Sequence, residues 1–215
     1  MVESLYFDFA PYMEQEPQRI LRDEGVNGLN AVAVLEAVGR GAERPSEIAA
    51  RLGTAQTNLS LLLSQLLDAS VLTRELPFGE SLRSTKKILY RIQDATMRFW
   101  FRVYSPHQSR WSAYAPEQKR RLIYEHAATV FEGFCRARFP GAQRYWESDV
   151  ELDLVAPDPD DAKRLLMAEV KWRRLTVAER KNLLRQLESK WRRCSLQRRH
   201  PNVRFEVFDA GNLAG

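Results

Sequence analysis

Several residue types and patterns that support particular chemistries are scarce in this sequence of 215 residues. Its two cysteines, Cys135 and Cys194, are too few for a disulfide framework or for a cysteine-based zinc site. No apolar run approaches the length that crosses a membrane, and Met1–Ser4 lack the basic and then apolar pattern of a signal peptide. We therefore expect a cytoplasmic protein with reduced thiols and no membrane partner.

The sequence also lacks the phosphate-binding motif Gly-x-x-x-x-Gly-Lys-Ser/Thr, so it offers no nucleotide site of that type. Positive charge is present but unevenly spread. The formal net charge is +5, and the stretch from Lys163 to Arg204 has fourteen basic and three acidic residues, a local net charge of +11. Residues 1–162 carry a net charge of −4. A basic block attracts the phosphodiester backbone of nucleic acid, although an ordinary solvated surface is the alternative.

Beside this basic block, two stretches alternate polar and apolar residues with a period of two, which predicts β-strands. Residues two apart in a strand point to the same face of the sheet. In the first stretch, residues 150–155, we therefore expect Glu151 and Asp153 to share one face and Leu152 and Leu154 to share the other.

The second stretch, residues 165–172, places Glu169 and Lys171 on one face by the same rule. If the two strands are neighbours, three carboxylates and one ammonium group converge. Such a cluster of like charges is costly unless a cation lies among them, and Mg²⁺ prefers oxygen ligands. The alternative is that these charges form only the solvated face of a half-exposed strand.

Residues 28–93 have the pattern of a winged helix-turn-helix. Five leucines between residues 59 and 67 fall at helical spacing and predict a third, buried helix. Two strand-like runs follow, residues 71–76 and 88–92, around a basic loop that forms the wing. The exposed side of the third helix has no lysine or arginine, so we expect the loop to supply the phosphate contacts if this module binds DNA. A spacer or protein-docking module is the alternative.

The remaining residues flank this module on both sides. Residues 1–27 are expected to form an N-terminal arm with one short helix, Gln15–Glu24. Residues 94–215 are expected to form a second domain that includes its connecting helices. A long helix from Glu117 to about Arg138 carries Glu132, and a capping-box pattern at Thr176–Glu179 begins a later helix. A final strand is expected at residues 203–208.

The acidic strands resemble a known motif. Glu151-x-Asp153, about fifteen residues, and then Glu169-x-Lys171 is similar to the active-site pattern of the PD-(D/E)XK nuclease superfamily. The resemblance implies a restriction-endonuclease-like α/β domain, and together with the winged helix-turn-helix pattern before it the expected fold class is α+β, with the winged helix at the N-terminal side. It also implies that Asp153 and Glu169 hold Mg²⁺ or Mn²⁺, together with the backbone carbonyl of Val170.

The same resemblance implies roles for the other members of the motif. Lys171 would orient or activate the attacking water and offset charge on the scissile phosphate. Glu151 would hold a second metal ion or order water, and Glu132 would assist from its helix. The basic residues expected to bind nucleic acid are Arg173, Arg180, Lys181, Arg185, Lys190 and Arg193, with Arg83, Lys86 and Lys87 in the wing loop.

A longer resemblance covers most of the chain from about residue 15. The segments Lys86–Asp94 and Arg98–Arg102, taken with the acidic strands, look like the C-terminal region of archaeal and bacterial AAA+ ATPases of the STAND type, a region of unknown function. In those proteins a P-loop ATPase domain comes first. The resemblance therefore implies either a stand-alone relative or an ATPase partner domain outside these 215 residues.

Two functions follow as hypotheses from these patterns. The first is a metal-dependent nuclease, with DNA as the expected substrate, targeted by the winged helix. The second is a non-catalytic DNA-binding regulator, or an interaction module for an ATPase, built on a nuclease-like scaffold. Either hypothesis is compatible with a homodimer. Metal-dependent cleavage, as opposed to binding without cleavage, distinguishes the two.

Overall fold

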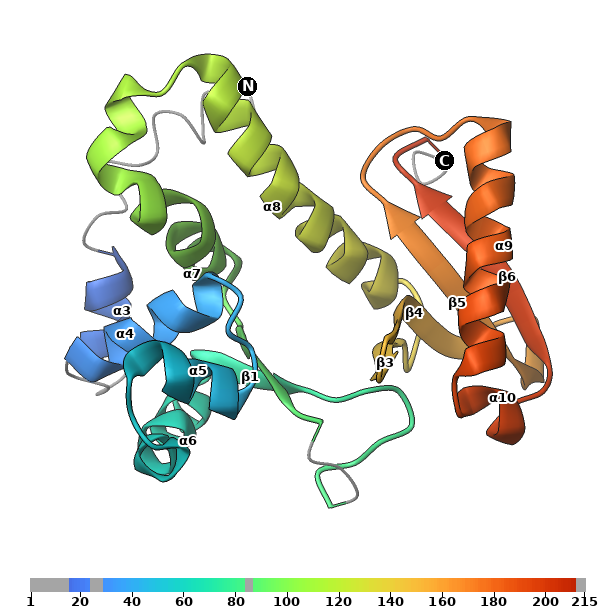
Figure 1. Cartoon of the computed structure of the whole chain (residues 1–215), viewed down its shortest axis with the longest axis horizontal. Helices are drawn as coiled ribbons and strands as arrows, with labels where there is room; N and C mark the ends of the chain where they lie inside the picture. Colours follow the sequence, from blue (N-terminus) through green and yellow to red (C-terminus); the bar gives the residue numbers. More distant parts are fainter. Residues whose placement is uncertain (1–15, 24–28, 84–86, 212–215) are drawn as a thin grey trace. The chain divides into compact units, whose positions relative to one another are not determined.

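The computed structural model describes residues 16–23, 29–83 and 87–211. The protein is a mixed α and β structure, as expected (Figure 1). Its internal contacts divide the chain into two units: unit 1 comprises Met1–Glu75 and Ile88–His126, and unit 2 comprises Leu76–Lys87 and Ala127–Gly215. Among the residues described, no helix combines the length and the apolar character needed to cross a bilayer.

Unit 1 is mainly helical. In chain order its elements are α3 (Glu16–Asp23), α4 (Leu29–Gly39), α5 (Pro45–Leu52), the 3₁₀ turn η1 (Gln56–Leu59), α6 (Ser60–Asp68), β1 (Leu72–Glu75), β2 (Leu89–Ile92), α7 (Ala95–Phe99), the π-helical turn η2 (Trp100–Tyr104), the 3₁₀ segment η3 (Ser105–Ala113) and the first part of α8 (Pro116–Ala137). The predicted pairing of the two short strands is confirmed, because β1 and β2 are antiparallel with Leu72 opposite Ile92. Most of the N-terminal arm expected at residues 1–27 lies outside the described residues, except for α3.

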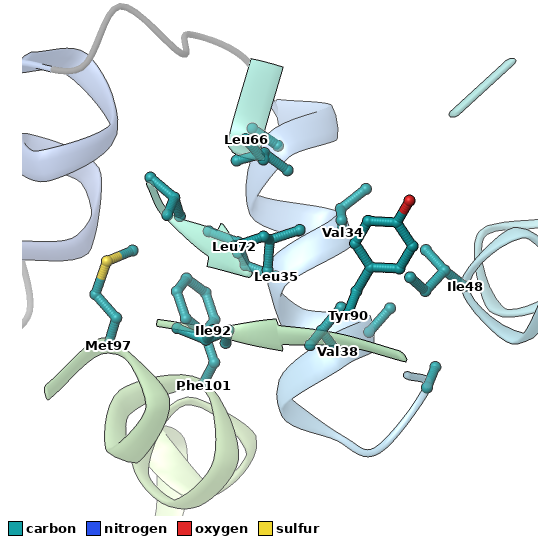
Figure 2. Close-up of a cluster of buried hydrophobic side chains, with 14 of the residues drawn as sticks. Val34, Leu35, Val38, Ile48, Leu66, Leu72, Tyr90, Ile92, Met97 and Phe101 are labelled. Carbon is teal, nitrogen blue, oxygen red and sulfur yellow. The ribbon is translucent and has the colours of Figure 1, made fainter. Parts of the chain in front are cut away.

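The core of unit 1 joins the helices to the hairpin. Val34 and Leu35 of α4 are fully buried, and they cluster with Leu66, Leu72 and Phe101 (Figure 2). This packing explains why unit 1 continues past the domain boundary expected at residue 94. The aromatic segment after the hairpin completes the core of unit 1. The approach is close, since a Cβ atom on residue 39, a glycine, would lie 2.6 Å from Cβ of Phe101.

Unit 2 is a four-stranded sheet with helices. Its elements are the last part of α8, β3 (Gln143–Glu147), β4 (Val150–Asp158), β5 (Asp161–Lys171), α9 (Val177–Arg193), α10 (Leu196–Arg199) and β6 (Val203–Asp209). The strand order is β3-β4-β5-β6, in which β5 and β6 are parallel and the other pairs are antiparallel. The chain crosses from β5 to β6 through α9, which packs on β4, β5 and β6 (Figure 1). The predicted helix start is confirmed, because Thr176 and Glu179 form a capping box.

The loop expected to be a wing, Leu76–Lys87, belongs by its contacts to unit 2. The backbone N–H of Phe78 donates to the carbonyl of Arg144 on β3 at 2.8 Å. The Phe78 ring packs on a core cluster of the sheet and lies 6.3 Å, edge-on, from the ring of His200. The part of this loop near Phe78 is therefore held by a backbone hydrogen bond to β3 and by apolar contacts with the core of the sheet.

The side chains of the sheet point to two separate cores. On β5, Leu165 and Met167 lie on the face covered by α9, whereas Leu166 and Ala168 lie on the face covered by the end of α8. The strict alternation on this strand agrees with the predicted period of two.

Strand β4 does not keep this alternation. Leu152 and Val155 both lie on the α9 face, whereas Leu154 lies on the α8 face. The pairing with β3 shifts register at the same place, because Leu152 faces Tyr145 but Val155 faces Gln143. The expectation that Leu152 and Leu154 share a face is therefore wrong, because an extra residue inserted at Asp153–Leu154 forms a β-bulge.

Cys135 and Cys194 are both free and buried. Burial raises the pKa of the Cys135 thiol to about 11, and it also raises the pKa of Cys194. A thiol with a raised pKa is mostly protonated at neutral pH, and the thiolate is the nucleophilic form. We therefore assign neither cysteine a catalytic role.

His126 on α8 gives unit 1 a titratable core group. Its ring packs edge-on against Phe99, and its Nδ1 atom has no hydrogen-bond partner among the described residues. Burial, followed by the charges of Arg102 and Arg98, lowers the pKa of His126 from 6.5 to about 4. The folded protein thus keeps this ring neutral at a pH where the unfolded chain protonates it.

We expect this histidine to make the stability depend on pH. Between pH 6.5 and about 4 the unfolded chain binds a proton that the folded protein does not. The free energy of unfolding should therefore fall as the pH falls through this window, by about 3 kcal/mol, and be insensitive to His126 above it. Urea unfolding of wild type and His126→Phe at several pH values measures the effect. Equal pH profiles for the two proteins would contradict it.

Candidate active site

Strands β4 and β5 stop pairing next to Asp153. Leu154 opposite Ala168 is their last backbone pair toward this end. Beyond it, the N–H of Val170 donates to Oδ2 of Asp153 at 2.8 Å. The Asp153 carboxylate thus accepts the hydrogen bond that a backbone carbonyl of β4 would accept if the two strands stayed paired. Because the N–H and C=O of one strand residue point to the same side, the carbonyl of Val170 is also directed toward β4.

Two lysines meet the neighbouring carboxylate of Glu169. Lys171 Nζ donates to Oε1 of Glu169 at 2.8 Å and lies 3.8 Å from Oδ2 of Asp153. Lys190 Nζ, from α9, donates to Oε2 of Glu169 at 2.9 Å. We call Asp153, Glu169, Lys171 and Lys190 the acid–lysine cluster. With all four groups ionised, its formal charges balance.

Burial and charge act differently on the two carboxylates of the cluster. Burial, and then the charge of Glu169, raise the pKa of Asp153 above its usual value. Burial alone would also raise the pKa of Glu169, but Lys171 and Lys190 outweigh it and hold this pKa below its usual value. Burial alone would lower the pKa of Lys171, yet Glu169 and Asp153 raise it. Asp153 is therefore the carboxylate whose negative charge is less well compensated.

Helix α8 supports the cluster from the opposite face of the sheet. Arg136 Nη1 donates to the backbone carbonyl of Asp153 at 2.9 Å. The same nitrogen lies 3.8 Å from Oε2 of Glu132, one helical turn earlier. The charge of Glu132 also contributes to the raised pKa of Lys171. Glu132 therefore acts on the cluster through its charge and through Arg136.

Glu151 forms an ion pair with Arg144 on β3. Its side chain is 55% exposed, compared with 14% for Asp153 and 11% for Glu169. The structure thus brings together Asp153, Glu169 and Lys171 of the predicted motif and gives Glu151 a partner on another strand. The bulge at Asp153 explains why residues 151 and 153 are not equivalent.

Four of the nine basic residues expected to bind nucleic acid form ion pairs with acidic residues of the chain. Arg173 pairs with Glu179 at 2.8 Å, Arg180 with Asp209 at 2.5 Å, Arg193 with Asp149 at 2.7 Å and Lys190 with Glu169 at 2.9 Å. Lys181 and Arg185 lie exposed on α9, and Arg83 and Lys87 lie exposed in the loop of residues 76–87. Lys86 lies outside the described residues. Of the predicted contacts on α9, Lys181, Arg185 and Arg193 are exposed, and Arg193 is paired with Asp149.

Sequence reasoning did not place Lys190 or Arg136 at this site. The sequence pattern predicts that Lys190 is one of the surface charges of α9, although it follows the fully buried Leu187 by three residues and so lies near the buried stripe. Arg136 follows Glu132 by four residues, a spacing at which helical side chains meet. Both spacings are visible in the sequence, but neither shows that these side chains reach β4 or β5.

Comparisons with known proteins find similarity to proteins of unknown function. A family model for archaeal and bacterial proteins of unknown function, DUF234, matches residues 100–183. This stretch includes Asp153, Glu169 and Lys171 and ends before Lys190.

An uncharacterised protein of Methanocaldococcus jannaschii is 28% identical to the chain over 215 aligned positions, which cover 88% of this chain and 48% of the relative. The chain thus spans about half the length of that relative. No solved structure matches the chain.

Proposed function

We propose that the protein is a divalent-metal-dependent nuclease that hydrolyses phosphodiester bonds, with DNA as the expected substrate. The observation that carries the proposal is the meeting of Asp153 and Glu169, from neighbouring strands, at the ammonium group of Lys171. These three residues stand in the order of the PD-(D/E)XK pattern. The sheet between α8 and α9 and the helices with a hairpin in unit 1 agree with a nuclease-like domain and a winged helix.

The residues present fit a magnesium or manganese ion. Asp153 and Glu169 offer carboxylate oxygens and Val170 offers a carbonyl directed to the same side, and Mg²⁺ prefers such oxygen ligands. In residues 16–23, 29–83 and 87–211, no group of three or more His, Cys, Asp or Glu side chains forms a metal site. Mg²⁺ commonly binds through one or two carboxylates and completes its shell with water and substrate phosphate, so two are enough.

Each residue of the cluster would then have a separate role. Asp153 and Glu169 would hold the ion, which acts as a Lewis acid and offsets charge at the phosphate. Lys171, placed between both carboxylates, would orient the attacking water and stabilise negative charge that develops on the phosphate oxygens. Arg136 would fix the backbone of Asp153, and Glu132 would act through Arg136.

Cleavage assays test the proposal directly. The purified chain is incubated with single- and double-stranded DNA and RNA in Mg²⁺, in Mn²⁺ and in a chelator. Cleavage that needs the ion supports a nuclease. If no substrate is cut with either ion and calorimetry detects no ion binding, the proposal fails.

Nucleic-acid binding should depend on the exposed basic residues of α9. Each phosphate neutralised releases counterions, so the affinity falls as salt rises. We expect Lys181→Glu with Arg185→Glu to weaken the affinity for any sequence by roughly tenfold or more at moderate salt and to flatten the salt dependence. Fluorescence anisotropy at several salt concentrations measures both effects.

Arg121→Glu is the matched control for this charge reversal. Arg121 lies exposed on the part of α8 that belongs to unit 1, where it pairs with Glu125. Its reversal should change the affinity much less. If the α9 double variant binds as tightly as wild type, the basic surface of α9 is only a solvated face.

A second candidate function is binding without cleavage. The observation that favours it is the balance of charge in the acid–lysine cluster, because both oxygens of Glu169 already have an ammonium partner. On this view the chain is a DNA-binding regulator or an interaction module for an ATPase. The chain covers about half of its M. jannaschii relative, so a further domain in such proteins is part of this proposal. Nucleic-acid binding with no ion-dependent cleavage would select it.

A further inference from the structure

Lys190 has a place in the cluster that the nuclease motif does not explain. It comes from α9, after the segment that the family model matches, whereas Asp153, Glu169 and Lys171 all lie on β4 and β5. Its side chain is 28% exposed and ends 2.9 Å from Oε2 of Glu169. An ammonium group at this distance makes a charge-assisted hydrogen bond.

Glu169 therefore has a cation on each of its oxygens. Lys171 holds Oε1 and Lys190 holds Oε2, and the side chain of Glu169 is only 11% exposed. A divalent ion that approaches either oxygen meets a fixed positive charge a few ångströms away. In a partly buried site this repulsion is weakly screened, so it is much larger than it would be in water.

We infer that Lys190 is an internal counter-ion that competes with the divalent ion for Glu169. The inference rests on the proposed function, because it assumes that Glu169 is a metal ligand. Lys190 stabilises the buried carboxylate when no ion is present, and it must leave Oε2 before that oxygen can bind an ion. Lys171 forms ion pairs with both Glu169 and Asp153, so it keeps a partner if Oε1 of Glu169 binds the ion. Within the cluster, Lys190 forms an ion pair with Glu169 alone.

Removal of the Lys190 charge should raise the affinity for the ion. In Lys190→Met the side chain keeps its length and apolar stem but loses the ammonium group. We expect Mn²⁺ to bind about tenfold more tightly than to wild type, because one like charge beside the site is gone. The melting temperature without ion should fall, since Glu169 loses a partner, and the rise on adding Mn²⁺ should be larger than in wild type. Isothermal titration calorimetry and thermal melts with Mn²⁺ alone measure both.

Two further variants isolate the role of the charge. Lys190→Arg keeps a cation beside Glu169, so its affinity for Mn²⁺ should stay near that of wild type. Arg192→Met removes a charge from the same helix, but Arg192 pairs with Glu188 at an exposed position. It should leave Mn²⁺ binding unchanged. Lys190→Gln repeats the test with a polar neutral side chain if the methionine variant folds poorly.

The outcomes separate the inference from the proposed function. Tighter binding in Lys190→Met, or binding there but not in wild type, supports the inference. If wild type binds Mn²⁺ and the methionine and glutamine variants bind it equally or more weakly, the counter-ion role is wrong but the nuclease proposal stands. If neither wild type nor any variant binds Mn²⁺, both are wrong.

Discussion

Asp153→Asn is expected to abolish nucleic-acid cleavage while the fold is kept. Asparagine retains a side-chain oxygen that can accept the N–H of Val170, so the separated ends of β4 and β5 should keep their geometry. What is lost is one of two negative charges that would hold the divalent ion. We expect the cleavage rate to fall at least about a hundredfold, as when a single electrostatic stabiliser is removed from an active site.

Three measurements define this result. Cleavage of DNA in Mg²⁺ or Mn²⁺ reports activity, calorimetry reports ion binding, and circular dichroism reports the fold. Asp149→Asn is the matched control, because Asp149 is an exposed acid just before β4 that pairs with Arg193. It should keep both activity and ion binding. Undiminished cleavage by Asp153→Asn would mean that the activity comes from another site or from a contaminant.

Asp209→Ala is expected to be the most destabilising of the substitutions considered. Asp209 lies at the end of β6 with its side chain 3% exposed. It accepts hydrogen bonds from Arg180 at 2.5 Å and from the backbone N–H groups of Leu175 and Gly211. Alanine removes the buried acceptor that these three donors share. The free energy of unfolding should fall by about 3 to 5 kcal/mol, as for other buried charge pairs that lose one partner.

Urea unfolding measures this loss, and Asp160→Ala provides the comparison. Asp160 pairs with Arg204 but its side chain is 71% exposed, so its removal should cost at most about 1 kcal/mol. Equal stability of Asp209→Ala and Asp160→Ala would show that the buried pair contributes little. Asp209 also fixes Leu175, which follows Lys171 by four residues, so a folded Asp209→Ala protein should lose activity as well.

Local patterns in the sequence predicted much of the fold. The alternation of β5, the long helix α8 and the capping box of α9 all follow from short-range periodicity or spacing, and the structure confirms them. The hairpin β1–β2 was also predicted, because two apolar runs flank a loop with proline and glycine. The meeting of Asp153 with Glu169 and Lys171 followed from the assumption that the two strands are neighbours.

What could not be predicted depends on tertiary contacts. A period of two assumes an uninterrupted strand, so it misses the bulge that puts Leu152 and Leu154 in different cores. Lys190 reaches Glu169 only because α9 crosses over β5. The segment that includes Phe101 joins unit 1 because residue 39 has no side chain to keep it away.

The path of the chain has a consequence for how this protein can be divided. Unit 2 consists of two pieces of sequence, Leu76–Lys87 and Ala127–Gly215, with part of unit 1 between them. A fragment that starts at residue 94 or 127 therefore lacks Phe78 and its hydrogen bond to Arg144. A single cut in the gene cannot release either unit whole. In recombination, by evolution or by design, the two units are thus expected to be inherited together rather than exchanged as independent modules.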